Sequence, residues 1–585
     1  MASKFSILAA GLLASAVALA DTVDVTYTLG SAAGTLQPLL GVNAGPLHWG
    51  TKTATKDVTL GFQQIGVKSV RTHDMPGALD MAVMYPDRTK DPSLQSSYNF
   101  GSGGSLSDYG SDYAVTMLKN NGLEMYLRIW DSAQGVVAPS SSERANWVKA
   151  AVEVVRHYQE GKWNGFTNLV TYVEIGNEPD STYFWPSTYT KEEFYALYSD
   201  TAIAIRAAFP SLKIGGPGVT QSGYKDSTGR QWTRSFLDYV KSAGAPLDFL
   251  SWHTYTNSPD DFSMGAAFYR SELDSRGFTS TEQHLTEWHT FVTPTNDPTA
   301  DAANLETRTM GKGAALLTTS WINLQQSGFK QAFIYRANDP GATDHSRYGL
   351  FSTDALPRKT ALAFSLWSEF AAYGDRIDPV ASATVSGLKA LATQRADGQM
   401  AILVANTGTA TEKWTVGFSD TRQLSDYPRS LKTVDDNHAL VDVSVPTGTS
   451  FDIAANTVQL LTLHARTGSF SASATSFGTA SALLLGANLQ VAGADIGASR
   501  TVYLAANLGN QWWFHNGTGW VYWTSGNFPS YSTGALPALL SVPIFSAASD
   551  TQSLSGIQLY MGYGASAAEM VSATRYKPIY TFTAN

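Results

Sequence analysis

The stretch Tyr172-Val-Glu-Ile-Gly-Asn-Glu-Pro-Asp180 joins the pattern of a short strand to that of a sharp turn. Tyr172, Glu174 and Gly176 alternate with apolar residues, as residues do in a strand with two different faces. Proline cannot continue such a strand, because it has no backbone N–H to donate to the sheet. The strand therefore ends at Asn177-Glu178-Pro179, and Glu178 is expected at its carboxyl end.

Strand and helix patterns alternate on both sides of this segment, from about residue 38 to 372. Eight strand–helix units in one uninterrupted series favour an α/β fold, a closed (β/α)8 TIM barrel, over an open doubly wound sheet. No Gly-x-Gly-x-x-Gly follows the first strand, which disfavours dinucleotide binding. The expected strands are Leu39–Asn43, Val67–Thr72, Glu124–Ile129, Val170–Ile175, Leu212–Gly216, Phe249–His253, His284–Glu287 and Ala332–Arg336. The expected helices include Asn146–Gln159, Lys191–Ala208, Thr233–Ser242, Leu305–Gln325 and Thr360–Tyr373.

The sequence pattern changes after about residue 375. Short alternating segments between 388 and 463 are separated by Gly, Asp, Asn and Thr, which predicts a β-sandwich over residues 375–466. A strand at 22–28 precedes the barrel, and we expect residues 21–37 to join the sandwich. A Ser/Ala/Thr-rich stretch at 469–481 marks a boundary, so residues 467–585 are expected to form a C-terminal β-rich domain. The barrel then occupies residues 38–374.

The first twenty residues have the three parts of a secretion signal. Lys4 supplies a positive start, residues 5–19 form an apolar run that is short for a bilayer span, and Ala18-Leu19-Ala20 is a small-x-small cleavage site. We therefore expect a signal peptide at 1–20 and a secreted or periplasmic protein, exported by a bacterial route. The sequence contains no cysteine, so no disulfide can form.

Composition and charge disfavour several classes of protein. Of the 585 residues, 43% are hydrophobic and 15% are charged, which excludes general disorder and supplies more than one core. The net charge of −9 and the lack of a Lys/Arg-dense run argue against nucleic-acid binding. No segment after the signal is long and apolar enough to be a membrane span. His-Glu-x-x-His is absent and Gly-x-Ser-x-Gly does not occur at strand ends, so we expect neither metal nor cofactor, and no serine-hydrolase chemistry.

A second acidic segment, His284-Leu-Thr-Glu-Trp-His289, lies three strand units after the first. In a closed barrel, strands four and seven deliver Glu178 and Glu287 to the same rim, where barrel active sites lie. Two carboxyl groups beside a glycosidic oxygen are what sugar transfer needs: one protonates the leaving group and the other attacks or activates water. The pair would lie about 5–5.5 Å apart in a retaining enzyme and about 6.5–9.5 Å apart in an inverting one.

These motifs resemble those of the clan of retaining (β/α)8 glycosidases, and within it of family 39 glycoside hydrolases, which include β-xylosidases and α-L-iduronidases. The resemblance covers roughly residues 35–465. It rests on Asn177-Glu178-Pro179 and Glu287, with Gly41-Val-Asn-Ala-Gly-Pro46, Val70-Arg-Thr-His-Asp74, Ser251-Trp-His-Thr-Tyr255, Gly349-Leu-Phe351 and Pro357-Arg-Lys359. It implies a retaining O-glycosyl hydrolase.

The resemblance also implies roles for the central residues. Glu178 would be the general acid/base, protonated in the free enzyme, and Glu287 the ionised nucleophile. Asn177 would hydrogen-bond the sugar 2-hydroxyl, a contact that strengthens in the transition state. His253 or Tyr255 would orient the nucleophile, and the sequence does not choose between them. His73 matches a sugar-binding histidine of the family, although a buried histidine that ties the rim together fits equally well.

Further rim residues are expected around the sugar. His48, Trp130, Trp288 and Arg336 are candidates for lining the pocket, although Trp288 has the alternative of packing outward. Arg71 is expected to pair with a carboxylate inside the barrel mouth, and the rim carboxylates Asp74 and Glu174 are candidate partners.

The substrate is expected to be an oligo- or polysaccharide of a neutral sugar, with a xylosidase-like activity favoured. Iduronidase-like enzymes place a basic residue soon after the histidine of strand six, whereas His253-Thr-Tyr-Thr-Asn257 contains none. A uronate carboxylate left without a cationic partner would lose its hydration uncompensated. The loop Met75–Gly104 is long enough to close one end of the cleft, which favours exo action. The oligomeric state is not predicted.

Three alternatives remain open. The chain could be an endo-acting exopolysaccharide hydrolase, or a non-catalytic glycan-binding protein, which would be expected to lack one of the two carboxylates. It could also be a surface-adhesion protein whose C-terminal domain binds polysaccharide through its aromatic residues. Those rings serve equally well as the core of a small β-domain. They are Trp512, Trp513, Phe514, Trp520, Tyr522 and Trp523.

Overall fold

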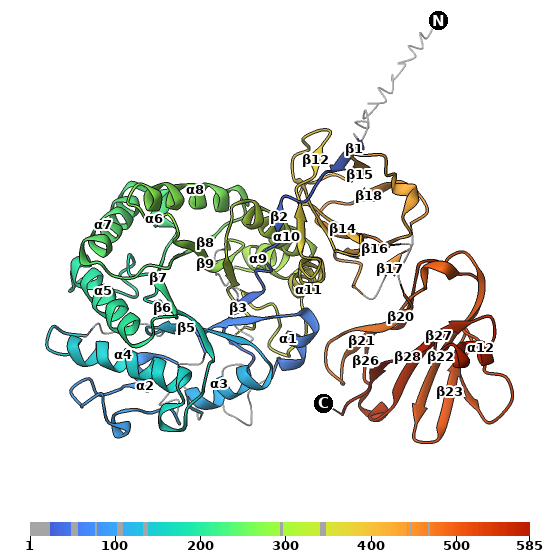
Figure 1. Cartoon of the computed structure of the whole chain (residues 1–585), viewed down its shortest axis with the longest axis horizontal. Helices are drawn as coiled ribbons and strands as arrows, with labels where there is room; N and C mark the ends of the chain where they lie inside the picture. The colour runs from blue at the N-terminus through green and yellow to red at the C-terminus, as the bar shows by residue number, and fades with distance from the viewer. Residues whose placement is uncertain are drawn as a thin grey trace, which may run out of the picture.

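A computed structural model describes most of the chain (Figure 1). It covers residues 24–47, 57–75, 79–101, 109–132, 139–292, 297–339, 347–440, 443–444, 446–465 and 469–584. The expected signal peptide, His48 and parts of the loop Met75–Gly104 lie outside these residues. None of the helices in the covered ranges is long and apolar enough to cross a bilayer.

Eight parallel strands close into a barrel in the order β10-β3-β4-β5-β6-β7-β8-β9. The predicted TIM-barrel fold class is therefore confirmed. The strands are β3 (Gly41–Asn43), β4 (Ser69–Arg71), β5 (Glu124–Ile129), β6 (Val170–Ile175), β7 (Lys213–Val219), β8 (Phe249–Tyr255), β9 (Glu282–His289) and β10 (Gln331–Ile334). A cluster of rings from different strands, Tyr126, Tyr172, Phe249 and Phe333, fills part of its interior.

Helices surround the barrel. They are α1 (Thr59–Ile65), α2 (Met81–Met84), α3 (Ser111–Asn120), α4 (Arg144–Gln159), α5 (Lys191–Ala208), α6 (Ser222–Lys225), α7 (Ser227–Ala243), α8 (Asp260–Asp274), α9 (Pro298–Thr309), α10 (Gly311–Gln326) and α11 (Lys359–Ala371). Helix α5 begins where its sequence predicts, because Thr190 and Glu193 form a capping box. Helix α7 begins earlier than expected, at the N-cap Asp226.

The single helix predicted at Leu305–Gln325 is wrong: α9 and α10 are separate, with Met310 between them in an extended conformation. The N–H of Gly311, at the start of α10, donates to Asp436 Oδ1 at 2.7 Å. This acceptor comes from a distant part of the chain. The only local signs of the break are therefore Gly311 and Gly313, which interrupt the helical pattern.

A β-sandwich packs beside the barrel, and the N-terminal strand lies within it. One sheet has the order β12-β1-β15-β18, and the other has the order β17-β16-β19-β14-β13-β11-β2. Strand β1 runs parallel to β15, and Tyr27 packs against Trp414 in the core between the sheets. The strands are β1 (Asp24–Leu29), β2 (Gly34–Thr35), β11 (Asp375–Ile377), β12 (Val380–Ala381), β13 (Leu388–Gln394), β14 (Met400–Asn406), β15 (Glu412–Phe418), β16 (Arg429–Val434), β17 (Val443–Ser444), β18 (Ser450–Ile453) and β19 (Thr457–Leu463).

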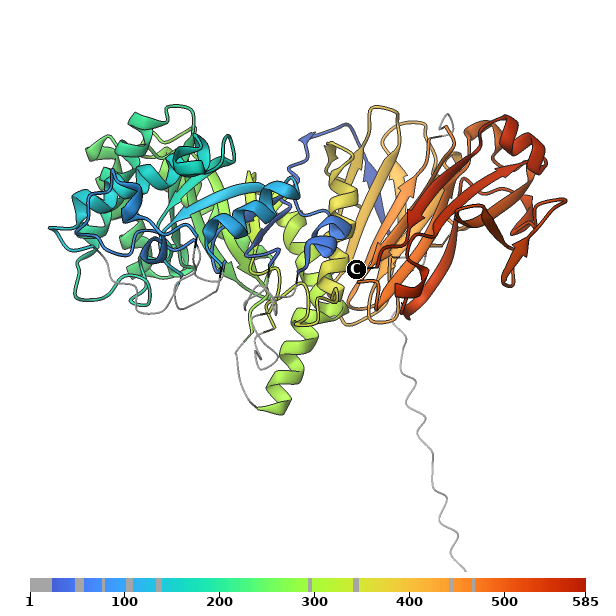
Figure 2. The same ribbon diagram turned by 90° about the horizontal axis from the view of Figure 1, so that it is seen from below.

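The C-terminal part forms two further antiparallel sheets, which lie at the far side of the sandwich from most of the barrel (Figure 2). The three-stranded sheet contains β20 (Ser471–Phe477), β21 (Leu483–Gln490) and β26 (Leu539–Ser549). The six-stranded sheet contains β22 (Ser499–Leu508), β23 (Gln511–His515), β24 (Trp520–Trp523), β25 (Ser532–Ala535), β27 (Gln558–Gly564) and β28 (Tyr576–Thr581). Helix α12 (Ala567–Ser572) follows β27.

Candidate active site

The two glutamates singled out by the sequence meet at the carboxyl end of the barrel. Strand β6 ends at Ile175, and Glu178 follows within three residues; Glu287 lies near the end of β9. One carboxylate oxygen of each glutamate and one ring nitrogen of His253 all lie within 4.8 Å of one another. This separation is close to that of a retaining pair and shorter than that of an inverting pair.

Glu178 is held by its own backbone and by one histidine. Its φ of 46° is unusual for a residue with a side chain, and its N–H donates to Gly218 O at 2.9 Å. The carboxylate Oε1 lies 2.9 Å from His253 Nδ1. Burial raises the pKa of Glu178 to about 7, against the opposing effect of the Arg71 charge. A glutamate in this setting keeps its proton near neutral pH.

Glu287 has a richer set of donors. Arg71 Nη1 donates to its Oε1 at 2.8 Å and Tyr255 Oη donates to its Oε2 at 2.8 Å. Burial raises the pKa of Glu287 above that of a free glutamate; the charge of Glu178 adds to this rise, and His253, Arg71 and Tyr255 limit it. Because two strong donors favour the charged form, Glu287 is the member of the pair better suited to be ionised.

Arg71 is the fully buried hub of the mouth. Its Nε donates to Glu174 Oε2 at 2.6 Å and its Nη2 donates to Asn177 Oδ1 at 2.7 Å. Its Nη1 also donates to Asn43 Oδ1 at 3.0 Å. Asn43 in turn donates to Thr286 O at 2.9 Å, in the strand that carries the nucleophile candidate. Arg71 thus pairs with carboxylates inside the mouth as expected, and Glu174 is one of its two partners.

The structure separates the two candidates for orienting Glu287. Tyr255 donates directly to Glu287, whereas His253 Nδ1 lies 3.6 Å from Glu287 Oε2 and bonds Glu178 instead. Burial lowers the pKa of His253, so the ring is neutral near pH 7. Burial keeps the pKa of Tyr255 well above 10, so its hydroxyl remains a donor. Tyr255 therefore takes the contact that the sequence left open.

Several predicted sugar-binding residues carry a buried polar atom that has no partner among the described residues, and two of these residues, Asn177 and His73, lie beside the glutamates. Asn177 is 1% exposed and its Nδ2 has no hydrogen bond, because only its Oδ1 is used by Arg71. His73 is 4% exposed, with Nε2 at 3.5 Å from Glu287 Oε1 and Nδ1 unbonded. Buried polar atoms are normally bonded, so these two are suited to meet the hydroxyls of a ligand.

Two expected pocket residues do not face the pocket: Trp288 takes the alternative of packing outward, and the prediction for Trp130 is wrong. Trp288 is fully buried and packs edge-to-face against Phe262 of α8 and Trp321 of α10. Trp130 is 2% exposed and packs against Trp147 of α4 and other rings of the helical layer. Both rings belong to the packing between strands and helices, so neither offers a face to a sugar.

The remaining rim residues form ion pairs. Arg336 Nη1 lies 3.2 Å from Asp74 Oδ2, and Arg128 Nη2 lies 2.6 Å from Asp80 Oδ1. Tyr335 also donates to Asp74. Four residues of the barrel mouth were not predicted: Asn43, Arg128, Asp80 and Tyr335. For Asn43 and Tyr335 a signal existed, because both lie at the carboxyl ends of predicted barrel strands.

Glu178, His253 and Glu287 are close enough to share a metal ion, and no other such group occurs among the residues that the structure describes. Carboxylates and a neutral imidazole are suitable ligands in principle. Here, however, the Arg71 cation already occupies one oxygen of Glu287, and a metal ion would have to sit beside that positive charge. The arrangement favours acid–base and nucleophilic chemistry by the side chains themselves.

A closed (β/α)8 barrel with two glutamates at its carboxyl end has the architecture of the two-carboxylate glycosidases. The family described as "Glycosyl hydrolases family 39" matches residues 55–376, which is more than half of the chain. The protein therefore belongs to glycosyl hydrolases family 39, as its motifs predicted.

Two curated relatives and one solved structure are similar to this chain. A "Beta-xylosidase" of Geobacillus stearothermophilus is 26% identical over 282 residues, which are 44% of this chain and 51% of the relative. A "Beta-xylosidase" of Caldicellulosiruptor saccharolyticus is 30% identical over 184 residues, which are 28% of this chain and 34% of the relative. The matches thus span about half of the first relative and about a third of the second. The crystal structure of a glucosidase from Croceicoccus marinus is 25% identical with a TM-score of 0.61, and covers 76% of this chain and 99% of that one.

Proposed function

We propose that the protein is a secreted, retaining glycoside hydrolase that cleaves a neutral glycan, with a xylosidase-like specificity, by double displacement. The observation that carries the proposal is the contact geometry of Glu178 and Glu287, which lie within 4.8 Å of each other in different hydrogen-bonding environments. Secretion is inferred from the N-terminal segment Met1–Ala20 alone.

In the first step Glu287 attacks the anomeric carbon and Glu178 gives its proton to the departing glycosidic oxygen. The bond to the leaving group breaks as an ester bond to Glu287 forms. The negative charge of Glu287 is then gone, which favours the ionised form in which the first step leaves Glu178. In the second step Glu178 takes a proton from water, the hydroxide adds to the anomeric carbon and Glu287 leaves as a carboxylate.

The charges of the mouth support an uncharged sugar. Arg71, Arg128 and Arg336 each already pair with a carboxylate, at distances between 2.6 and 3.2 Å. A uronate would have to compete with these partners for a cation, at the cost of leaving a buried carboxylate unpaired. The names of the two curated relatives favour xylose among the neutral sugars.

The test is hydrolysis of a panel of aryl glycosides by the parent protein and the variants Glu178→Ala and Glu287→Ala. Loss of the acid should spare activated aryl leaving groups, which need little protonation, more than natural linkages. Azide should rescue Glu178→Ala with retained configuration and Glu287→Ala with inverted configuration. Equal losses on all substrates, with no glycosyl azide from either variant, would contradict the assigned roles.

A further inference from the structure

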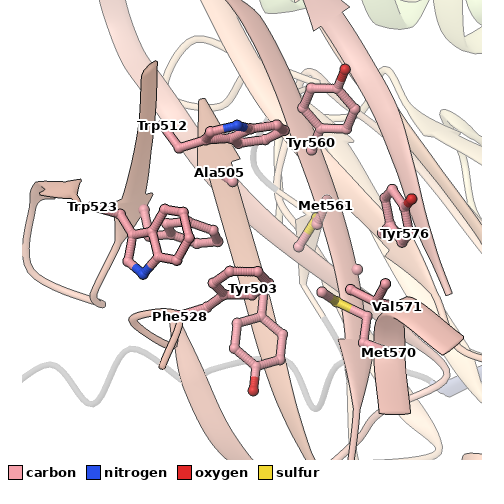
Figure 3. Close-up of a pocket in the computed structure, with 12 residues that line it drawn as sticks. Tyr503, Ala505, Trp512, Trp523, Phe528, Tyr560, Met561, Met570, Val571 and Tyr576 are labelled. Carbon is pink, nitrogen blue, oxygen red and sulfur yellow. The ribbon is translucent and has the colours of Figure 1, made fainter. Parts of the chain in front are cut away.

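A cavity far in sequence from the two glutamates lies on one face of the six-stranded C-terminal sheet (Figure 3). We call it the aromatic pocket. It has a volume of about 290 Å³, and three tyrosines, two tryptophans and two phenylalanines line it. The family match ends at residue 376, so the pocket lies outside the matched region.

The strand register explains why a hollow forms here. Ala505 of β22 is paired with Phe514 on one side and with Tyr560 on the other, so these three side chains share one face of the sheet. Trp512 is paired directly with Trp523 across the β23–β24 hairpin. A small residue in the middle of large rings leaves a depression with aromatic walls on a rigid sheet.

The rings place apolar surface at the centre and polar atoms at the edge. Figure 3 shows the hydroxyl groups of Tyr503, Tyr560 and Tyr576 pointing away from the middle of the pocket. The lining contains no Asp, Glu, Lys or Arg. The pocket therefore suits an uncharged ligand with an apolar face and a polar rim. Tyrosine and tryptophan fit such a ligand because each has an apolar ring and one polar group that can hydrogen-bond at the edge.

A pyranose ring has this distribution of polarity, with apolar C–H faces and hydroxyls around its edge. The volume of about 290 Å³ is roughly twice that of a cavity that holds benzene, which leaves room for a ring with its substituents. A fully apolar acyl chain would not use the polar rim. An ionic ligand would enter without a counter-charge.

We propose that the aromatic pocket is a glycan-binding site that holds one sugar ring of an uncharged polysaccharide by stacking on Trp512 and its neighbours. The choice of xylan as the ligand rests on the proposed function, whereas the site itself rests on the pocket. The pocket would hold the enzyme on an extended polymer while the barrel acts elsewhere on it.

The C-terminal domain is fixed to the barrel as this role requires. Gln64 of α1 donates to Gly478 O at 3.1 Å and accepts from Gly478 N at 3.1 Å. This paired amide contact joins a barrel helix to the loop after β20. Binding at the pocket therefore raises the local concentration of polymer at the barrel, but does not affect a small substrate.

The experiment measures depletion of the full-length protein by insoluble xylan, with Glu287→Ala in every protein to prevent degradation. We expect Trp512→Ala to weaken the apparent Kd by about tenfold or more, because it removes one stacking surface. Tyr576→Ala, at a rim position that is 37% exposed, should weaken it less and tests the site with little risk to folding. Trp520→Ala is the matched control: it removes a 41% exposed tryptophan of the same hairpin that lines a different cavity.

Unchanged binding by both pocket variants, or an equal loss in the Trp520→Ala control, would overturn the proposal. Tryptophan fluorescence that saturates with an alkyl phenol but not with xylo-oligosaccharides would also overturn it, because the pocket would then hold an apolar ligand. In a second set of proteins that keep Glu287, hydrolysis of a small aryl xyloside should be the same in Trp512→Ala, Tyr576→Ala and Trp520→Ala. Xylan binding that depends on the pocket, with no hydrolysis by the protein that keeps Glu287, would contradict the proposed function but not the pocket proposal. Hydrolysis with no dependence of binding on the pocket would contradict the pocket proposal but not the proposed function.

Discussion

Replacement of Tyr255 by Phe removes one hydroxyl from the mouth and little else. That hydroxyl donates to Glu287 Oε2 at 2.8 Å, and a hydrogen bond to a charged group is worth about 1.5–3 kcal/mol. Loss of the donor disfavours the carboxylate, so the pKa of Glu287 should rise. One pKa unit corresponds to about 1.4 kcal/mol, so the expected rise is about one to two units.

The assay is the pH dependence of kcat/KM with an aryl xyloside. The acid limb reports ionisation of the nucleophile in the free enzyme, so it should move to higher pH by about one to two units in Tyr255→Phe. Tyr224→Phe is the control, because it removes a buried hydroxyl that contacts Thr254 of the same strand at 3.1 Å, away from Glu287. An acid limb at the same pH in parent and Tyr255→Phe would refute the positioning role, whatever the loss in rate.

Four further outcomes follow from the structure. Burial raises the pKa of Glu178 to about 7, so kcat/KM should fall as pH rises through about 7. Glu178 binds its proton more tightly in the folded protein than in the unfolded chain. The Tm of the protein should therefore fall as the pH rises from about 4.5 to about 7, and it should fall less in Glu178→Gln. Gly218 has a φ of +67°, and a Cβ added there would lie 3.1 Å from His253 Nε2, so Gly218→Ala should lower kcat about tenfold. Gly277 has a φ of +84° but lies in open space, so Gly277→Ala should lower the stability of the fold and leave kcat unchanged. Trp288→Ala should destabilise the protein to urea by about 3–5 kcal/mol with KM unchanged; a raised KM would mean that the ring lines the pocket after all.

Local signals were enough to predict the barrel and its central pair. Pro179 ends the strand β6 pattern, and parallel strands place their carboxyl ends at one rim, so Glu178 and Glu287 follow from chain order once the barrel is assumed. The alternation of side chains along β9 could also have predicted the direction of Trp288. If Glu287 points into the mouth, its neighbour must point outward toward the helices.

The strand register and the long-range contacts could not be predicted from the sequence. A bulge between Trp252 and His253 pairs His253 with Glu287 across β8 and β9, and the residue types give no sign of it. The choice between His253 and Tyr255 depends on that shift. Trp130 follows the end of β5, where alternation no longer fixes direction, and its burial is decided by rings of α4 and α5.

The charges of the mouth give a reason why one glutamate keeps its proton. Arg71 is the cation that contacts both Glu174 and Glu287, so the three groups together carry one negative charge. Ionised Glu178, whose side chain is 21% exposed, would add a second negative charge beside buried groups, and its hydrogen-bond partner His253 is neutral. In the proposed mechanism the ester neutralises Glu287 as Glu178 gives up its proton. The net charge of the four groups therefore stays at minus one in the free enzyme and in the intermediate, and neither step has to bury an additional charge.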